Sequence, residues 1–99
     1  MDQYQIVISP RASRDIRTIE RHTHKLWEAH QASAYVENIW EAIASLATFP
    51  EIGRVVAMGP PNTRRISVDR HIIFYRIGES SIEISRVVHE RRDVAWLLD

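Results

Sequence analysis

The spacing of apolar residues changes between the two halves of this chain, and that change constrains the fold more than any other feature. Between residues 10 and 46, apolar side chains recur every three or four positions, as they do in amphipathic helices. Between residues 64 and 88 they follow the two-residue period of strands. The sequence therefore predicts helices followed by a sheet, which is an α+β fold.

Two helices joined by a short connection are expected in the first half. Ser9 can cap the first helix and Pro10 suits its first position, while Phe49-Pro50 ends the second helix. The predicted buried positions are Ala12, Ile16, Ile19, Thr23 and Leu26, followed by Ala32, Tyr35 or Val36, Ile39, Ile43 and Leu46. We expect an antiparallel hairpin of helices, with Trp27 and Trp40 packed at its ends or margins.

Four strands are predicted around this hairpin, at residues 4–8, 64–68, 72–77 and 81–88. Tight turns separate the last three, which form an antiparallel meander. Because 99 residues suffice for one small domain, residues 1–99 are expected to form a single domain. The predicted architecture is a helical hairpin packed on one face of a mainly antiparallel four-stranded sheet, in the order β-α-α-β-β-β.

The strand at 72–77 is apolar at both alternating sets of positions, which is unusual for an antiparallel strand with one wet face. Its second face must therefore be covered by the C-terminal segment, a second copy of the chain or a different protein. In the free protein we expect the face around Ile73 or Phe74 to be partly exposed.

Composition excludes several functions. The 13 basic and 13 acidic residues cancel, so no global charge draws the chain to nucleic acid, and no cysteine is present. We predict a cytoplasmic protein without a membrane span, a cofactor or a metal. His22 and His24 point to different sides of a helix and so do not form a metal site, and His30 and His71 are expected on the surface.

Basic residues gather in two places. Arg14, Arg17, Arg21 and Lys25 line one side of the first helix, where a solvated face is the simplest interpretation. Residues 64–92 hold seven arginines against four acidic residues. These arginines can bind phosphate, pair with carboxylates of a partner, or pair internally with Glu83 and Glu90.

Several stretches together resemble the toxins of type II toxin–antitoxin modules in the ParE/RelE superfamily, specifically the ParE branch. The most specific are Arg65, the Ile73-Phe74-Tyr75-Arg76 strand and the stretch from Ile82 to Asp93. Weaker matches are Ala12, Asp15-Ile16, Ile19, Ala32, Tyr35, Ile39, Ile43, Leu46, Phe49-Pro50 and Gly53-Arg54.

The resemblance implies a toxin that arrests growth, is neutralised by a cognate ParD-like antitoxin and inhibits DNA gyrase by protein binding rather than catalysis. Direct sequence-specific nucleic-acid binding is not expected. Trp96, Leu97 and Leu98 either fold back as a cap or contact a partner. The candidate residues for contact with the target or the antitoxin are Arg65, Ile73, Phe74, Tyr75, Arg76, Arg86, His89, Arg91, Arg92 and Trp96.

One alternative is the RelE branch of ribosome-dependent mRNA endoribonucleases. Such an enzyme needs a base, an acid and positive charge, which His89, Tyr75 and Arg65 or Arg86 can supply. RelE-like enzymes, however, use lysines and a tyrosine near the C-terminus, whereas Lys25 is the only lysine here and no tyrosine follows Tyr75. Another alternative is an inactive homologue that only binds a partner.

Overall fold

A computed structural model describes residues 3–57 and 59–91. The predicted order of elements is confirmed, with one further short strand, so that the pattern is β-α-α-β-β-β-β. Predictions for Arg92, Trp96 and the C-terminal cap lie outside the described residues. The elements are β1 (Gln5–Ile8), α1 (Pro10–Leu26), α2 (Ala29–Ser45), β2 (Arg54–Val55), β3 (Thr63–Val68), β4 (His71–Ile77) and β5 (Ser81–His89).

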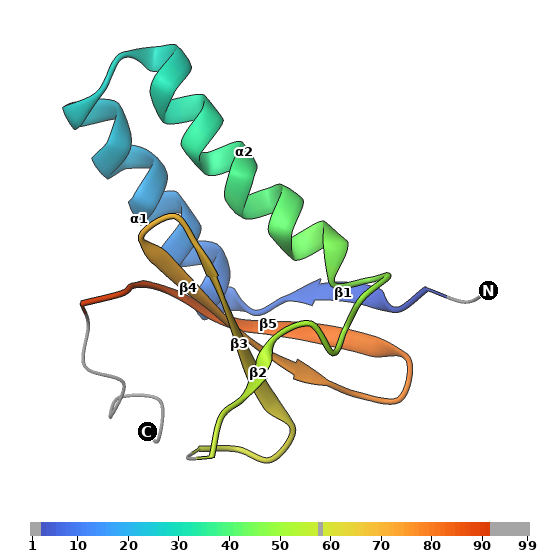
Figure 1. Ribbon diagram of the computed structural model, residues 1–99. Coiled ribbons are helices and arrows are strands. Elements are labelled where there is room, and N and C mark those ends of the chain that lie inside the picture. The colour runs from blue at the N-terminus through green and yellow to red at the C-terminus, as the bar shows by residue number, and fades with distance from the viewer. Residues whose placement is uncertain (1–2, 58, 92–99) are drawn as a thin grey trace.

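The sheet has five strands in the order β1-β5-β4-β3-β2 (Figure 1). Strand β1 is parallel to β5, and the other neighbours are antiparallel. The prediction of four strands is wrong because it omits β2, which pairs Arg54 with Arg65 and Val55 with Arg64. A two-residue strand is too short to show an alternating pattern, so only its pairing with β3 reveals it.

The start of α1 confirms the predicted cap. The Ser9 hydroxyl accepts a hydrogen bond from the Ala12 N–H at 3.0 Å, and Pro10 is the first helical residue. The same hydroxyl donates to the Ser85 carbonyl at 3.0 Å. One side chain therefore both begins α1 and attaches it to β5.

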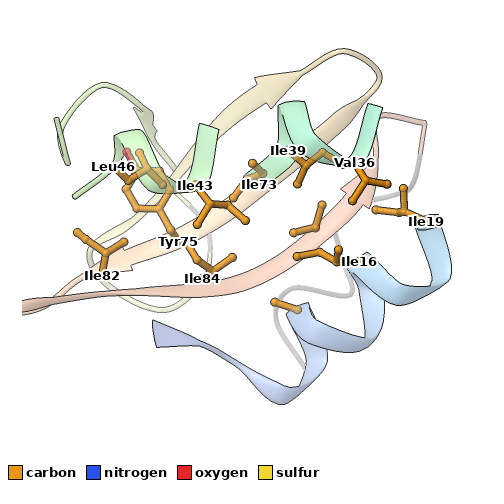
Figure 2. Close-up of a cluster of buried hydrophobic side chains, with 12 residues drawn as sticks. Ile16, Ile19, Val36, Ile39, Ile43, Leu46, Ile73, Tyr75, Ile82 and Ile84 are labelled. Carbon is orange, nitrogen blue, oxygen red and sulfur yellow. The ribbon is translucent and has the colours of Figure 1, made fainter. Parts of the chain in front are cut away.

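The core lies between the hairpin and one face of the sheet (Figure 2). The predicted helical positions are buried except Leu26, which is 63% exposed, and Tyr35, which is half-buried. Trp27 and Trp40 are about 40% exposed and lie at the margins rather than in the core. The end of the hairpin that carries the turn between α1 and α2 extends past the sheet, so no strand lies against it (Figure 1).

The second face of the sheet carries a smaller buried cluster of Ile72, Phe74 and Val88, against which Val56 packs. The predicted burial of both faces of β4 is confirmed. The expected exposure around Ile73 or Phe74 is wrong, since these side chains are 0% and 1% exposed. Ile73 faces the helices, whereas Phe74 lies in the second cluster.

Candidate functional site

Arg86, a candidate for partner contact, forms an ion pair with Asp15 of α1. Its Nε lies 2.7 Å from Oδ2 of Asp15 and its Nη2 lies 3.1 Å from Oδ1. Oδ2 also accepts the Val87 N–H at 2.9 Å, and both charged side chains are about 15% exposed. This bidentate arrangement holds α1 against β5. The internal partner is Asp15 rather than the predicted Glu83 or Glu90, because folding brings together residues 71 positions apart.

Tyr75, another candidate, is completely buried on the face covered by the helices. Its hydroxyl donates to the Pro50 carbonyl at 2.7 Å and accepts the Gly53 N–H at 2.9 Å. Burial raises the pKa of this phenol above its ordinary value of 10.0. The side chain therefore anchors the loop before β2 and is not available to a substrate.

The other described candidates fall into different environments. Ile73 and Phe74 are buried, and Arg76 Nε donates to the Pro61 carbonyl at 3.2 Å. Arg91 is exposed, and its backbone N–H donates to Nδ1 of His89. We also expected the candidates Arg65, Arg86, Arg91 and Arg92 to form one arginine-rich edge, but β4 separates Arg65 on β3 from Arg86 on β5. Of the predicted acidic partners, Glu90 lies 3.9 Å from Arg70.

A cluster of aromatic rings joins α2 to the ends of β4 and β5. The Tyr35 hydroxyl lies 2.6 Å from Nδ1 of His71, and the rings of His71 and His89 are 5.3 Å apart. Trp27 extends the cluster, with its ring 5.2 Å from that of Tyr35. The prediction that His71 is a surface residue is wrong, because the ring is half-buried beneath α2.

This environment keeps His71 neutral. Burial, and then the nearby His89, lowers the pKa of His71 from 6.5 to about 4. Burial also raises the pKa of Tyr35, which retains its proton. The Tyr35 hydroxyl and Nδ1 of the neutral His71 therefore form an ordinary structural hydrogen bond at neutral pH.

The underside of the projecting hairpin borders a groove of about 890 Å³. Its lining includes the exposed Leu26 and Trp27 from the far end of the hairpin and the ring of His71. Asp69 and Arg70, at the turn between β3 and β4, supply charge beside these apolar groups. Apolar side chains with a polar rim suit a protein segment.

Tyr75, Arg86 and His89, three of the groups named for a ribonuclease, lie apart in the described structure. Tyr75 is buried on the helical side of β4 and the Arg86 guanidinium is held by Asp15. His89 pairs with His71 at the end of β5, three residues beyond Arg86, which corresponds to about 10 Å along a strand. No group of three potential metal ligands occurs within 3–57 and 59–91. Nor is any helix in these ranges long and apolar enough to cross a membrane.

A strand, a helical hairpin and a mainly antiparallel sheet whose last strand pairs in parallel with the first define the RelE/ParE fold. The fold matches a solved structure described as the chromosomal ParDE TA system from P. aeruginosa, with a TM-score of 0.75 at 19% identity. That match covers 88% of this chain and 96% of the other.

The sequence comparisons identify the family. Residues 6–94 match the family of the ParE toxin of the type II toxin-antitoxin system parDE. A Toxin ParE1 of Mycobacterium tuberculosis is 36% identical, covering 89% of this chain and 91% of the relative. A Toxin ParE1 of Caulobacter vibrioides is 30% identical, covering 84% and 85% respectively. This chain therefore belongs to the ParE toxin family.

Sequence reasoning missed Asp15 as the partner of Arg86 and Tyr35 as the partner of His71. From the sequence, Asp15 stands out only as part of the family resemblance. The available signal was an acid next to the apolar positions Ala12 and Ile16, because an acid near the core usually has a basic partner.

Proposed function

We propose that this ParE toxin arrests growth by binding DNA gyrase, and that a cognate antitoxin neutralises it by binding the toxin. The chief support is the arrangement of Tyr75 and Arg86, whose polar atoms are already engaged within the fold. A protein that acts by binding needs no convergent acid and base. Membership of the ParE family supports the same proposal.

The groove beneath the hairpin is the surface that we assign to the antitoxin. Leu26 and Trp27 are 63% and 39% exposed there. Covering such side chains stabilises a complex through burial of apolar area. The P. aeruginosa structure of the same fold is described as a ParDE TA system.

Two assays run in parallel test the proposal. Purified toxin is added to DNA gyrase in a supercoiling and cleavage assay, and to ribosomes translating a defined mRNA. The variants are His89→Ala and, as a matched control, His30→Ala, which removes an exposed histidine from the start of α2. We expect gyrase inhibition with intact mRNA, and no effect of either substitution on the message.

Ribosome-dependent cleavage that is lost in His89→Ala and kept in His30→Ala would contradict the proposal and place the protein with the RelE-like nucleases. Induced expression of the toxin in growing cells supplies a further check. Growth that continues, together with unaffected gyrase and mRNA, would identify an inactive homologue that only binds a partner.

A further inference from the structure

Two arginines face each other at the β2 edge of the sheet. Arg54 on β2 and Arg65 on β3 are directly opposite in the register, so their side chains leave the sheet on the same face. Like charges in this position destabilise a sheet. Within the described parts of the chain, neither side chain forms a hydrogen bond or an ion pair with another described residue.

Other arginines of the same sheet are satisfied internally. Arg64 donates to the carbonyl oxygens of Gly53 and Glu51, and Arg76 donates to that of Pro61. Arg86 is bound by Asp15. Arg54 and Arg65 thus form a local excess of positive charge to which an external anion can bind.

Exposed apolar side chains occur in β2 and in the segment that leads into it. Phe49, Ile52 and Val55 are 61%, 66% and 68% exposed, although each is large and hydrophobic. Ile52 lines a groove of about 380 Å³ together with Arg54 and Arg65. The same isoleucine lines a second hollow, which it shares with Phe49. Ile52 therefore shares a groove with both arginines, whereas Val55 is opposite Arg64 and leaves the sheet on the other face.

The backbone of this surface is held in place by buried groups. The Tyr75 hydroxyl binds both the Pro50 carbonyl and the Gly53 N–H, and Arg64 binds the Gly53 carbonyl at 2.8 Å. A Cβ at Gly53 would lie 2.5 Å from the Tyr75 hydroxyl and 2.8 Å from the Arg65 carbonyl, so only glycine allows this close approach. The exposed side chains therefore project from an ordered segment, which lowers the entropy cost of binding.

We propose that the β2 edge surface, composed of Ile52, Arg54 and Arg65, binds an acidic protein segment that carries an apolar side chain. Carboxylates of the segment lie between the two guanidinium groups, and its apolar side chain packs on Ile52. Aliphatic groups favour protein over nucleic acid, whose bases stack on planar rings. The proposal concerns a class of partner and holds whether or not gyrase is the target.

Fluorescence anisotropy on the full-length toxin tests this proposal. The probes are a labelled synthetic peptide that alternates Glu and Leu, a peptide of the same length that alternates Lys and Leu, and an oligo-dT of comparable length. We expect binding of the Glu-Leu peptide alone. The Arg54→Gln/Arg65→Gln variant should bind it about tenfold more weakly, since two charge-assisted hydrogen-bonding groups are removed.

Arg11→Gln/Arg14→Gln is the matched control, because it removes the same charge from exposed residues of α1. It should leave the affinity for the Glu-Leu peptide unchanged. Ile52→Ser should weaken that affinity about threefold through loss of apolar contact. Circular dichroism melting of every variant verifies that it is folded.

Three results would overturn the proposal. Oligo-dT binding that depends on Arg54 and Arg65 would show a phosphate site instead. No binding of the Glu-Leu peptide, or equal weakening by the α1 control, would show that the β2 edge surface does not select acidic segments. The gyrase assay is independent of all three, so failure of the target assignment and failure of this surface are distinguishable.

Discussion

Arg86 and Arg65 are both register partners of Phe74, one on each side of β4, yet their surroundings are opposite. At β5, α1 contributes the Asp15 carboxylate, which binds Arg86 through two hydrogen bonds. At β3, the neighbouring strand contributes Arg54, a second cation. The charge of the neighbouring side chain thus decides whether each arginine stabilises the fold or remains available to a partner.

The two edges also differ in how they continue the pairing of strands. The register between β1 and β5 ends at Ile8 and Ile84, and beyond it Asp15 accepts the Val87 N–H in place of a strand. At the other edge, β2 pairs with only Arg64 and Arg65 of β3. The α1 junction is therefore a closed structural contact, whereas the β2 edge remains open to a binding partner.

The largest effect is expected at the closed contact. Asp15→Ala removes both hydrogen bonds to the Arg86 guanidinium and the acceptor of the Val87 N–H. The free energy of unfolding should fall by about 2–3 kcal/mol, measured by urea denaturation. Glu20→Ala, an exposed change on the same helix, is the control and should cost less than about 0.5 kcal/mol. Equal losses in the two variants would show that the junction is not a special contact.

Gly53→Ala should have the next largest effect and acts on the β2 edge. The added methyl group must displace the Tyr75 hydroxyl and the Arg65 backbone, which we expect to cost about 2 kcal/mol in thermal or urea unfolding. Gly78→Ala is the comparison, because its added Cβ meets its nearest neighbour at 3.3 Å. If Gly53→Ala is as stable as the parent, the loop is not held as tightly as the docking proposal requires.

A smaller effect is expected from the aromatic cluster that lies where β4 begins and β5 ends. The pKa of His71 is about 4 in the folded protein, below the ordinary 6.5. As pH falls through 6.5, the unfolded state takes up a proton before the folded state does, so stability is lost down to about pH 4.

Between pH 7 and pH 5 we expect this loss to reach about 1 kcal/mol, allowing for the partial exposure of the ring. Urea denaturation at several pH values measures it, and His71→Gln should have a shallower pH dependence than the parent. His30→Gln should retain the parental dependence. A His71→Gln profile that overlays the parental one would mean that this ring titrates normally.

The smallest expected effect has the opposite sign. Arg54→Gln/Arg65→Gln removes a repulsion between two cations and should raise the free energy of unfolding by up to about 0.5 kcal/mol. Differential scanning calorimetry at low salt is the measurement, and the gain should shrink as salt is added. A loss of stability would show that these arginines contribute to the fold and would weaken the contrast between the two edges.

Most of the elements were predictable because their signals are local. Ser9 and Pro10 mark the start of α1, and the alternation in residues 64–88 marks three strands. Strand β2 was missed because two residues are too few to show an alternating pattern. The candidate site was less predictable, since Tyr75 and Arg86 were selected for their chemistry while the fold uses that chemistry internally.

By itself, the sequence determined which segments become helices and strands, where α1 begins, and that both faces of β4 must be buried. These properties depend on residues within a few positions of one another. Only the tertiary structure decided that Asp15 binds Arg86 and that Arg54 lies opposite Arg65. Charge pairing depends on distance in space, and no local sequence pattern indicates which residues far apart in the chain will come into contact.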